Sequence, residues 1–233
     1  MIKIMLIAAL LPVMVLLFMV YQADRVEHEP AGLLFRLLLW GAFMGFPASL
    51  LETLLGNVIY NACASAGTSQ LVYQMLENVI GIALVEEGLK YAVVRWRTWR
   101  NPAFNFRFDG IVYCVFASLG FAAIENVLYG FSFGFTTLAV RAVTSIPGHA
   151  VFGVMMGYYY GRAKKFYDYG NRARAREFGR KALIIPVLFH GFYDLALSLN
   201  SAAMAGIWLI AIIVADVWAI RTVRREALTD EPV

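Results

Sequence analysis

Hydrophobic residues follow one another in long runs along this chain, without alternation between apolar and polar positions. Seven runs stand out, at residues 4–21, 33–55, 71–94, 110–131, 138–161, 182–199 and 202–220. A helix that crosses a bilayer needs about 17–25 such residues, whereas a barrel strand would alternate between lipid-facing and lumen-facing side chains. The pattern therefore predicts an all-α polytopic membrane helix bundle with about seven transmembrane helices.

The first run has one other interpretation, a cleaved signal peptide, because Lys3 precedes an apolar stretch. The stretch is long for such a segment, and Tyr21 and Gln22 near its end make a poor cleavage site. We therefore expect this run to be retained as a helix.

Composition supports a membrane protein and excludes an ordinary soluble domain. Of the 233 residues, 61% are hydrophobic and 15% are charged, against about 45–50% and 25% in soluble domains. No repeat, low-complexity tract or soluble domain interrupts the runs, so we predict a single membrane domain over residues 1–233 with its polar motifs in residues 71–199. We expect the bilayer as partner and no nucleic acid.

The basic residues predict the orientation of the bundle. Seventeen of the 20 Lys and Arg fall beside or after runs one, three, five and seven, and eight of them lie in the loop 162–181. The opposite loops carry none, and only Lys3 and Arg141 lie near that side. The positive-inside rule then places the C-terminus in the cytoplasm and the N-terminus outside. We expect the loop 162–181 to lie on anionic headgroups.

The third run contains charges, which are costly at bilayer depth. Glu86, Glu87 and Lys90 fall within five residues, and the spacings i,i+4 and i,i+3 let the lysine pair with either carboxylate. One interpretation is an ion pair that only fixes helix packing. The other is a carboxylate that does chemistry in an enclosed, hydrated pocket.

Three further runs carry polar residues at comparable depth. They are Glu125 and Asn126 in run four, His149 in run five, and the i,i+4 pair His190 and Asp194 in run six. At about 1.5 Å per residue from the basic side, Glu86 and His190 lie near 14 Å, His149 and Asp194 near 20 Å and Glu125 near 24 Å. These depths are compatible with one site near the midplane.

Run five also predicts a close helix contact. Ser145, His149, Gly153, Gly157 and Gly161 recur every four residues, and small residues at that spacing let helices approach. His149 should then face another helix rather than lipid, and the preceding Pro147 can break the helix.

The residue types favour hydrolysis by one of two mechanisms. In one, Glu86 activates water unaided, and His149, His190 and Asn126 stabilise the oxyanion. In the other, Glu125, His149 and His190 bind zinc, Glu86 is the base, and Asp194 orients a ligand. Both remain open, and no Ser or Cys nucleophile, Gly-Asp pair or His-Glu-x-x-His motif suggests another hydrolase.

Two other classes of function would use the same residues. A proton-coupled transporter also places Glu, His and Asp at the midplane, although seven runs without an inverted repeat do not favour it. A non-enzymatic adaptor would use them for packing alone. Cys63 and Cys114, in an expected exterior loop and a helix, indicate no disulfide, and we expect only packing or interfacial roles for Glu52, Glu77 and Asp216.

The order of the motifs resembles that of the PrsW family of intramembrane proteases, related to the CAAX prenyl endopeptidase and bacteriocin-processing superfamily. The matching residues are Glu86-Glu87-x-x-Lys90, Phe121-x-x-x-Glu125-Asn126, His149 and His190-x-x-x-Asp194. The wider superfamily usually has His and Asn where Glu125 and Asp194 stand, which favours PrsW.

The resemblance implies a protease of the bacterial cytoplasmic membrane that makes the site-one cut in a single-pass anti-sigma factor during envelope stress. Glu86 and Glu87 would be the essential pair, with His149 and His190 as their partners. Taken together with the residue chemistry, the expected catalytic group is Glu86, Glu87, Lys90, Asn126 and Asp194, and the expected metal ligands are Glu125, His149 and His190.

Overall fold

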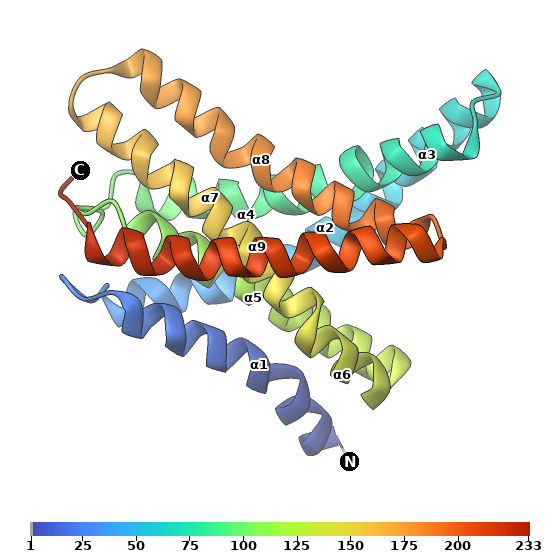
Figure 1. Ribbon diagram of the computed structural model, residues 1–233, viewed down its shortest axis with the longest axis horizontal. Helices are drawn as coiled ribbons and strands as arrows, with labels where there is room; N and C mark the ends of the chain where they lie inside the picture. The colour runs from blue at the N-terminus through green and yellow to red at the C-terminus, as the bar shows by residue number, and fades with distance from the viewer. Residues whose placement is uncertain (1) are drawn as a thin grey trace.

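The computed structural model describes residues 2–233, and most of them lie in a bundle of helices (Figure 1). The helices are α1 (Ile2–Ala23), α2 (Ala31–Ala66), α3 (Gln70–Leu76), the π-helix η1 (Glu77–Ala83), α4 (Leu84–Thr98), α5 (Asp109–Phe133), α6 (Phe135–Val143), α7 (Ser145–Asp168), α8 (Arg172–Ser198) and α9 (Ala202–Leu228). Over this range the structure has no strand, only an isolated bridge between Phe106 and Pro232.

The prediction of an all-α membrane bundle is confirmed. Six helical stretches are long and apolar enough to cross a membrane: α1, α2, α5, α6 with α7, α8 and α9. The third predicted run is instead a composite of α3, η1 and α4. These three helices follow one another without a break, and the segment differs from the other six because it holds the charges of the predicted site.

The structure also extends one helix and divides another. The expected exterior loop 56–70 is largely helical, because α2 continues to Ala66 and ends where Gly67 adopts a φ of 62°. The fifth predicted run is interrupted at Thr144, between α6 and α7. Pro147 explains this break, since its ring would clash with the carbonyl of Val143 in a continuous helix.

Helix α5 lies at the centre of the bundle. In its apolar window 72% of the residues are buried, against 22% in α1 and 17% in α9. Contact with α7 is close, because a Cβ at Gly157 would lie 2.4 Å from Cα of Ile111, and one at Gly161 would lie 2.1 Å from the carbonyl oxygen of Arg107. The glycine face predicted for run five therefore meets α5.

The basic loops gather at one end of the bundle, at the left of Figure 1, where the C-terminus also lies. We call this the basic end; it comprises the loops at residues 24–30, 99–108, 169–171 and 229–233 together with the helix ends beside them, which carry most of the basic residues. The turns α2–α3, α5–α6 and α8–α9 form the opposite end. Cys63 and Cys114 are both buried and free, so the expectation of no disulfide is confirmed.

Candidate active site

The centre of the site is the first two turns of α4, where a buried lysine joins two buried carboxylates. Lys90 Nζ lies 2.9 Å from Oε2 of Glu86 and 2.8 Å from Oε1 of Glu87. Lys90 and Glu87 are fully buried, and the side chain of Glu86 is 7% exposed. The predicted i,i+4 and i,i+3 pairs are therefore both present, and the lysine offsets the charge that burial would otherwise make costly.

Helix α7 brings His149 onto this group. Its Nδ1 lies 3.1 Å from Lys90 Nζ, and its Nε2 lies 2.9 Å from Oε2 of Glu125 on α5. Because an ammonium can only donate, Nδ1 accepts from Lys90, and Nε2 carries the proton that is donated to Glu125. The carbonyl of His149 accepts a hydrogen bond from Ser118 at 2.8 Å, which fixes the histidine against the central helix.

Helix α8 brings His190 to the other side of the carboxylate pair. Its Nδ1 lies 3.0 Å from Oε1 of Glu87, and its Nε2 lies 3.3 Å from Oδ2 of Asp194. The ring stacks on Phe152 with centroids 4.6 Å apart. The imidazole is therefore held between two carboxylates and in one plane.

These contacts form one continuous polar network across four elements, α4, α5, α7 and α8. The inner members Glu86, Glu87, Lys90, His149 and His190 are buried. The outer carboxylates are more accessible, since the side chains of Glu125 and Asp194 are 23% and 24% exposed. Seven of the eight predicted site residues thus meet at one place.

Asn126 is the exception, because it reaches the network only through Arg141 and contacts none of the other seven residues directly. Its amide nitrogen donates to the carbonyl of Ala9 at 2.8 Å, and its side-chain oxygen accepts from Nε of Arg141 at 3.0 Å. The expected contribution to the oxyanion site is therefore not supported by its position. Asn126 and Glu125 nevertheless contact the same group, because both accept from the guanidinium of Arg141.

Arg141 was not among the predicted site residues. Its Nη2 lies 2.9 Å from Oε2 of Glu125, the same oxygen that receives His149. Its guanidinium also lies over the ring of Tyr129 at 4.1 Å. The available signal was that this arginine stands alone in a segment otherwise free of basic residues.

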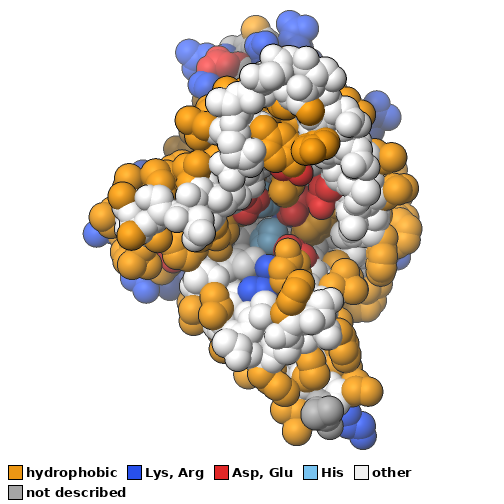
Figure 2. Space-filling view, turned by 90° about the vertical axis from the view of Figure 1, so that its right-hand side faces the viewer, with side chains coloured by type: hydrophobic (Ala, Val, Ile, Leu, Met, Phe, Trp, Pro, Cys, Tyr) orange, Lys and Arg blue, Asp and Glu red, His pale blue; other side chains and the backbone are white. Residues whose placement is uncertain are grey.

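The network opens toward the opposite end of the bundle. Figure 2, which views the molecule from that end, shows a hollow with acidic side chains and a histidine visible within it. The partial exposure of Glu125 and Asp194 agrees with this access. The site is therefore open toward the end that the charge pattern predicts to lie outside the cytoplasm.

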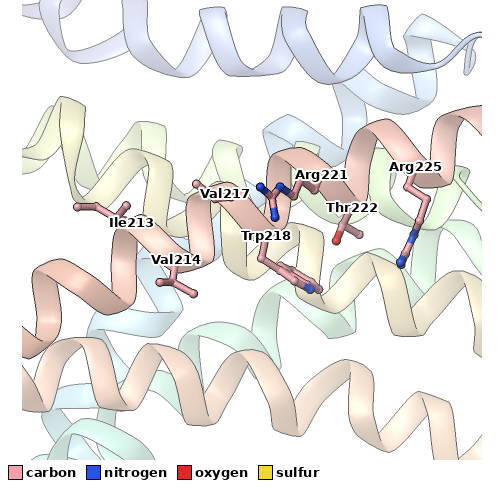
Figure 3. A pocket seen from close by; sticks show the side chains of 7 residues that line it. All are labelled: Ile213, Val214, Val217, Trp218, Arg221, Thr222 and Arg225. Carbon is pink, nitrogen blue, oxygen red and sulfur yellow. The ribbon is translucent and has the colours of Figure 1, made fainter.

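Another hollow, of about 710 Å³, lies along α9 and is separate from this network. Figure 3 shows that its lining includes Trp218, Arg221 and Arg225, all from α9. It holds no carboxylate or histidine side chain. Asp216 of the same helix lines a different pocket, between α1, α7 and α9, and no residue of the network lines that pocket.

Three residues of the network could hold a metal ion together. Ligand atoms of Glu86, Glu87 and His149 all lie within 4.8 Å of one another. Glu87 Oε2 is buried and has no hydrogen-bond partner among the residues described. Two carboxylates and an imidazole suit zinc, and the unpaired oxygen offers a free lone pair, so this donor set fits the ion.

The expected ligand set Glu125, His149 and His190 does not converge in this way within residues 2–233. Both nitrogens of His190 point at carboxylates, and Glu125 is paired with Arg141. Lys90 Nζ contacts one atom of each converging residue, so its ammonium supplies the positive charge at this position.

Comparison with known proteins agrees with the motif order. Residues 29–220 match the model of a family described as PrsW family intramembrane metalloprotease. Protease PrsW of Clostridioides difficile (strain 630) is 36% identical over 197 residues, which is 82% of this chain and 78% of that protein. Protease PrsW of Oceanobacillus iheyensis is 31% identical, covering 88% and 91%, and that of Bacillus subtilis (strain 168) is 30% identical, covering 82% and 81%. No solved structure matches. The expected resemblance is confirmed: the chain belongs to the PrsW family of multi-pass membrane proteases.

Proposed function

We propose that this protease cuts a single-pass membrane protein on the outer side of the bacterial cytoplasmic membrane, with Glu86 as the general base. The network across α4, α5, α7 and α8 carries this proposal, because it places a base, positive charge and an accessible hollow together. The substrate class that the resemblance suggests is an anti-sigma factor, for which this would be the site-one cut.

The two carboxylates of α4 take different roles. Glu87 is fully buried and paired with Lys90 and His190, so it acts as a positioning residue. Within residues 2–233, Glu86 pairs with Lys90 alone, and its side chain keeps 7% exposure. Glu86 is therefore the carboxylate that can take a proton from the attacking water.

Hydrolysis then needs stabilisation of the oxyanion and a proton for the leaving amine. Lys90 and Arg141 provide fixed positive charge beside the carboxylates, which favours a developing negative charge in a buried site. The proton that Glu86 takes from water passes to the amine as the C–N bond breaks. Asp194 keeps His190 oriented against Glu87.

Glu86, Glu87 and His149 would hold a zinc ion, for which the donor set is suitable. When bound, the ion would supply Lewis-acid activation of water and of the peptide carbonyl. Without the ion, Glu86 moves the proton and Lys90 balances the charge. Arg141 and Glu125 fix His149 in either case.

The proposal is tested by Glu86→Gln and Glu87→Gln with a co-expressed single-pass substrate. We expect both variants to insert in the membrane and to lose cleavage, because the base or its positioning partner is removed. Asp216→Asn is the matched control, since it neutralises an intramembrane carboxylate outside the network and should leave cleavage intact. Cleavage by both glutamate variants at the rate of the control would refute the proposed base.

A further inference from the structure

Beyond the protease site, a groove of about 970 Å³ lies at the basic end between α4 and α8. Four arginines line it: Arg95 from α4, and Arg172, Arg176 and Arg180 from α8. We call it the arginine groove. We propose that it binds the phosphate headgroup of an anionic phospholipid.

The arginines of this groove differ from several basic residues nearby in having no acidic partner. Over residues 2–233, none of the four forms an ion pair. By contrast, Arg162 pairs with Glu226 at 3.0 Å, Lys165 with Glu231 at 2.7 Å, and Lys181 with Glu177. The groove thus concentrates positive charge that the protein itself leaves unneutralised.

Aromatic rings hold two of these arginines in place. The guanidinium of Arg95 lies over Trp99 at 4.6 Å, and that of Arg172 lies over Tyr167 at 3.4 Å. Trp99 and Tyr167 also pack edge to face at 5.2 Å. Guanidinium groups that are already ordered lose less entropy when they bind a phosphate, and their fork geometry matches its oxygens.

The shape of the groove favours a lipid as the source of that phosphate. Leu183 and Ile184 line it on the side that continues into the membrane, and Ile184 is 50% exposed. Tyr91 closes the gap between the helices, since a Cβ at Gly179 would contact its hydroxyl at 3.5 Å. Basic pockets between helices at the membrane surface recognise phospholipid headgroups, and here apolar residues for an acyl chain lie beside the charges.

The test compares two double variants that remove the same charge. Arg95→Gln with Arg180→Gln takes one arginine from each wall of the groove. Arg100→Gln with Arg174→Gln is the control. Arg100 follows α4 and Arg174 lies in α8; both are exposed, and neither lines the groove. Detergent-purified proteins are mixed with phosphatidylglycerol or phosphatidylcholine, and retained lipid is measured by native mass spectrometry.

We expect the unsubstituted protein to retain phosphatidylglycerol in preference to phosphatidylcholine. The groove variant should lose about 30-fold in affinity for phosphatidylglycerol, equivalent to about 2 kcal/mol for two arginines, and the control should stay within about twofold. Equal losses in both variants would mean general surface attraction and would overturn the proposal. Equal retention of phosphatidylcholine, or displacement by inorganic phosphate as effective as by lipid, would overturn it too.

Discussion

Lys90 is surrounded by the same three residues whose ligand atoms converge as a metal site. Its ammonium lies 2.9 Å from Glu86, 2.8 Å from Glu87 and 3.1 Å from His149. A divalent ion bound by these residues would compete with the lysine for the same lone pairs. Zinc affinity should therefore depend on Glu87 and His149 more than on Glu125, which contacts the other ring nitrogen of His149.

This dependence can be measured by elemental analysis of purified protein at saturating zinc. We expect about one zinc ion per chain in the unsubstituted protein, as for a catalytic site with three protein ligands. Glu87→Gln and His149→Ala should fall below about half of that value, and Glu125→Gln should remain near it. Full zinc content in both ligand variants would exclude these residues as the zinc ligands. Full activity of zinc-free protein in a chelator would exclude a role for the metal in catalysis.

Several residues of the site could be predicted from the sequence because helix geometry fixes their partners. The pairs Glu86–Lys90 and His190–Asp194 follow from a spacing of four residues and are both observed. The role of Glu125 could not be predicted from residue spacing, because its partner Arg141 belongs to another helix. That contact depends on how α6 turns against α5, which no local pattern encodes.

At the scale of elements, the contact between α5 and α7 depends on the absence of side chains at glycine positions. Gly157→Ala would place a Cβ 2.4 Å from Cα of Ile111, so the two helices must separate. We expect a loss of about 1–3 kcal/mol in the free energy of unfolding, typical of overpacking. The measurement is unfolding of the detergent-solubilised protein in a denaturant series.

Gly206→Ala on α9 is the matched control for this substitution. Nothing lies within 4 Å of a Cβ at Gly206, so alanine there should stabilise the helix by about 0.5–1 kcal/mol. If Gly157→Ala were as stable as the unsubstituted protein, the close approach of α5 and α7 would not contribute to stability.

The segment between α1 and α2 should make stability depend on pH. Asp24 is 2% exposed, and burial raises its pKa to about 6 from an ordinary value of 3.8. The folded state therefore holds a proton that the unfolded state has released between these two values. The free energy of unfolding should fall as pH rises from about 4 to 7, because the Asp24 carboxylate is more costly to ionise in the buried site than in the unfolded chain.

Asp24→Asn should reduce this dependence, since the amide has no proton to lose. We expect its apparent midpoint of thermal unfolding to change less between pH 5 and pH 8 than that of the unsubstituted protein. Glu27→Gln, in the same segment but exposed, serves as control and should keep the dependence. An identical pH profile for Asp24→Asn would show that Asp24 is not the titrating group.

The π-helix η1 illustrates what the sequence could not reveal at this scale. Residues 71–94 have the composition of one long helix, and the extra residue in each π turn leaves no distinct pattern of side chains. The packing partner is visible only in three dimensions, because a Cβ at Gly191 of α8 would lie 2.7 Å from Cγ2 of Val79 in η1. Tertiary packing therefore decides the local winding here.

At the scale of the whole molecule, the charge pattern predicts which end of the bundle faces the cytoplasm. Single cysteines at Ser201 and Tyr169 test it, because both residues are exposed and lie at opposite ends. In a background with Cys63 and Cys114 replaced by alanine, an impermeant maleimide added to intact cells should label Ser201→Cys. It should label Tyr169→Cys only after the membrane is opened, and the reverse result would invert the orientation.

The all-α class and six of the seven long apolar helices follow from composition and length, because lipid imposes both. The ends of the runs did not follow as well. The loop 56–70 is polar enough to suggest a loop, yet α2 continues through most of it. Outside the hydrocarbon core a helix has no need of apolar side chains, so hydropathy stops reporting on it there.

The central helix has a consequence for how a substrate enters. A Cβ at Gly120 of α5 would lie 2.1 Å from the carbonyl oxygen of Leu38 on α2. A Cβ at Gly153 of α7 would lie 2.9 Å from Cα of Val115 on α5. The main chain of α5 is in close contact with the main chains of α2 and α7, so these three helices cannot slide past one another. A peptide that reaches the site therefore has to enter without separating α5 from α2 or α7.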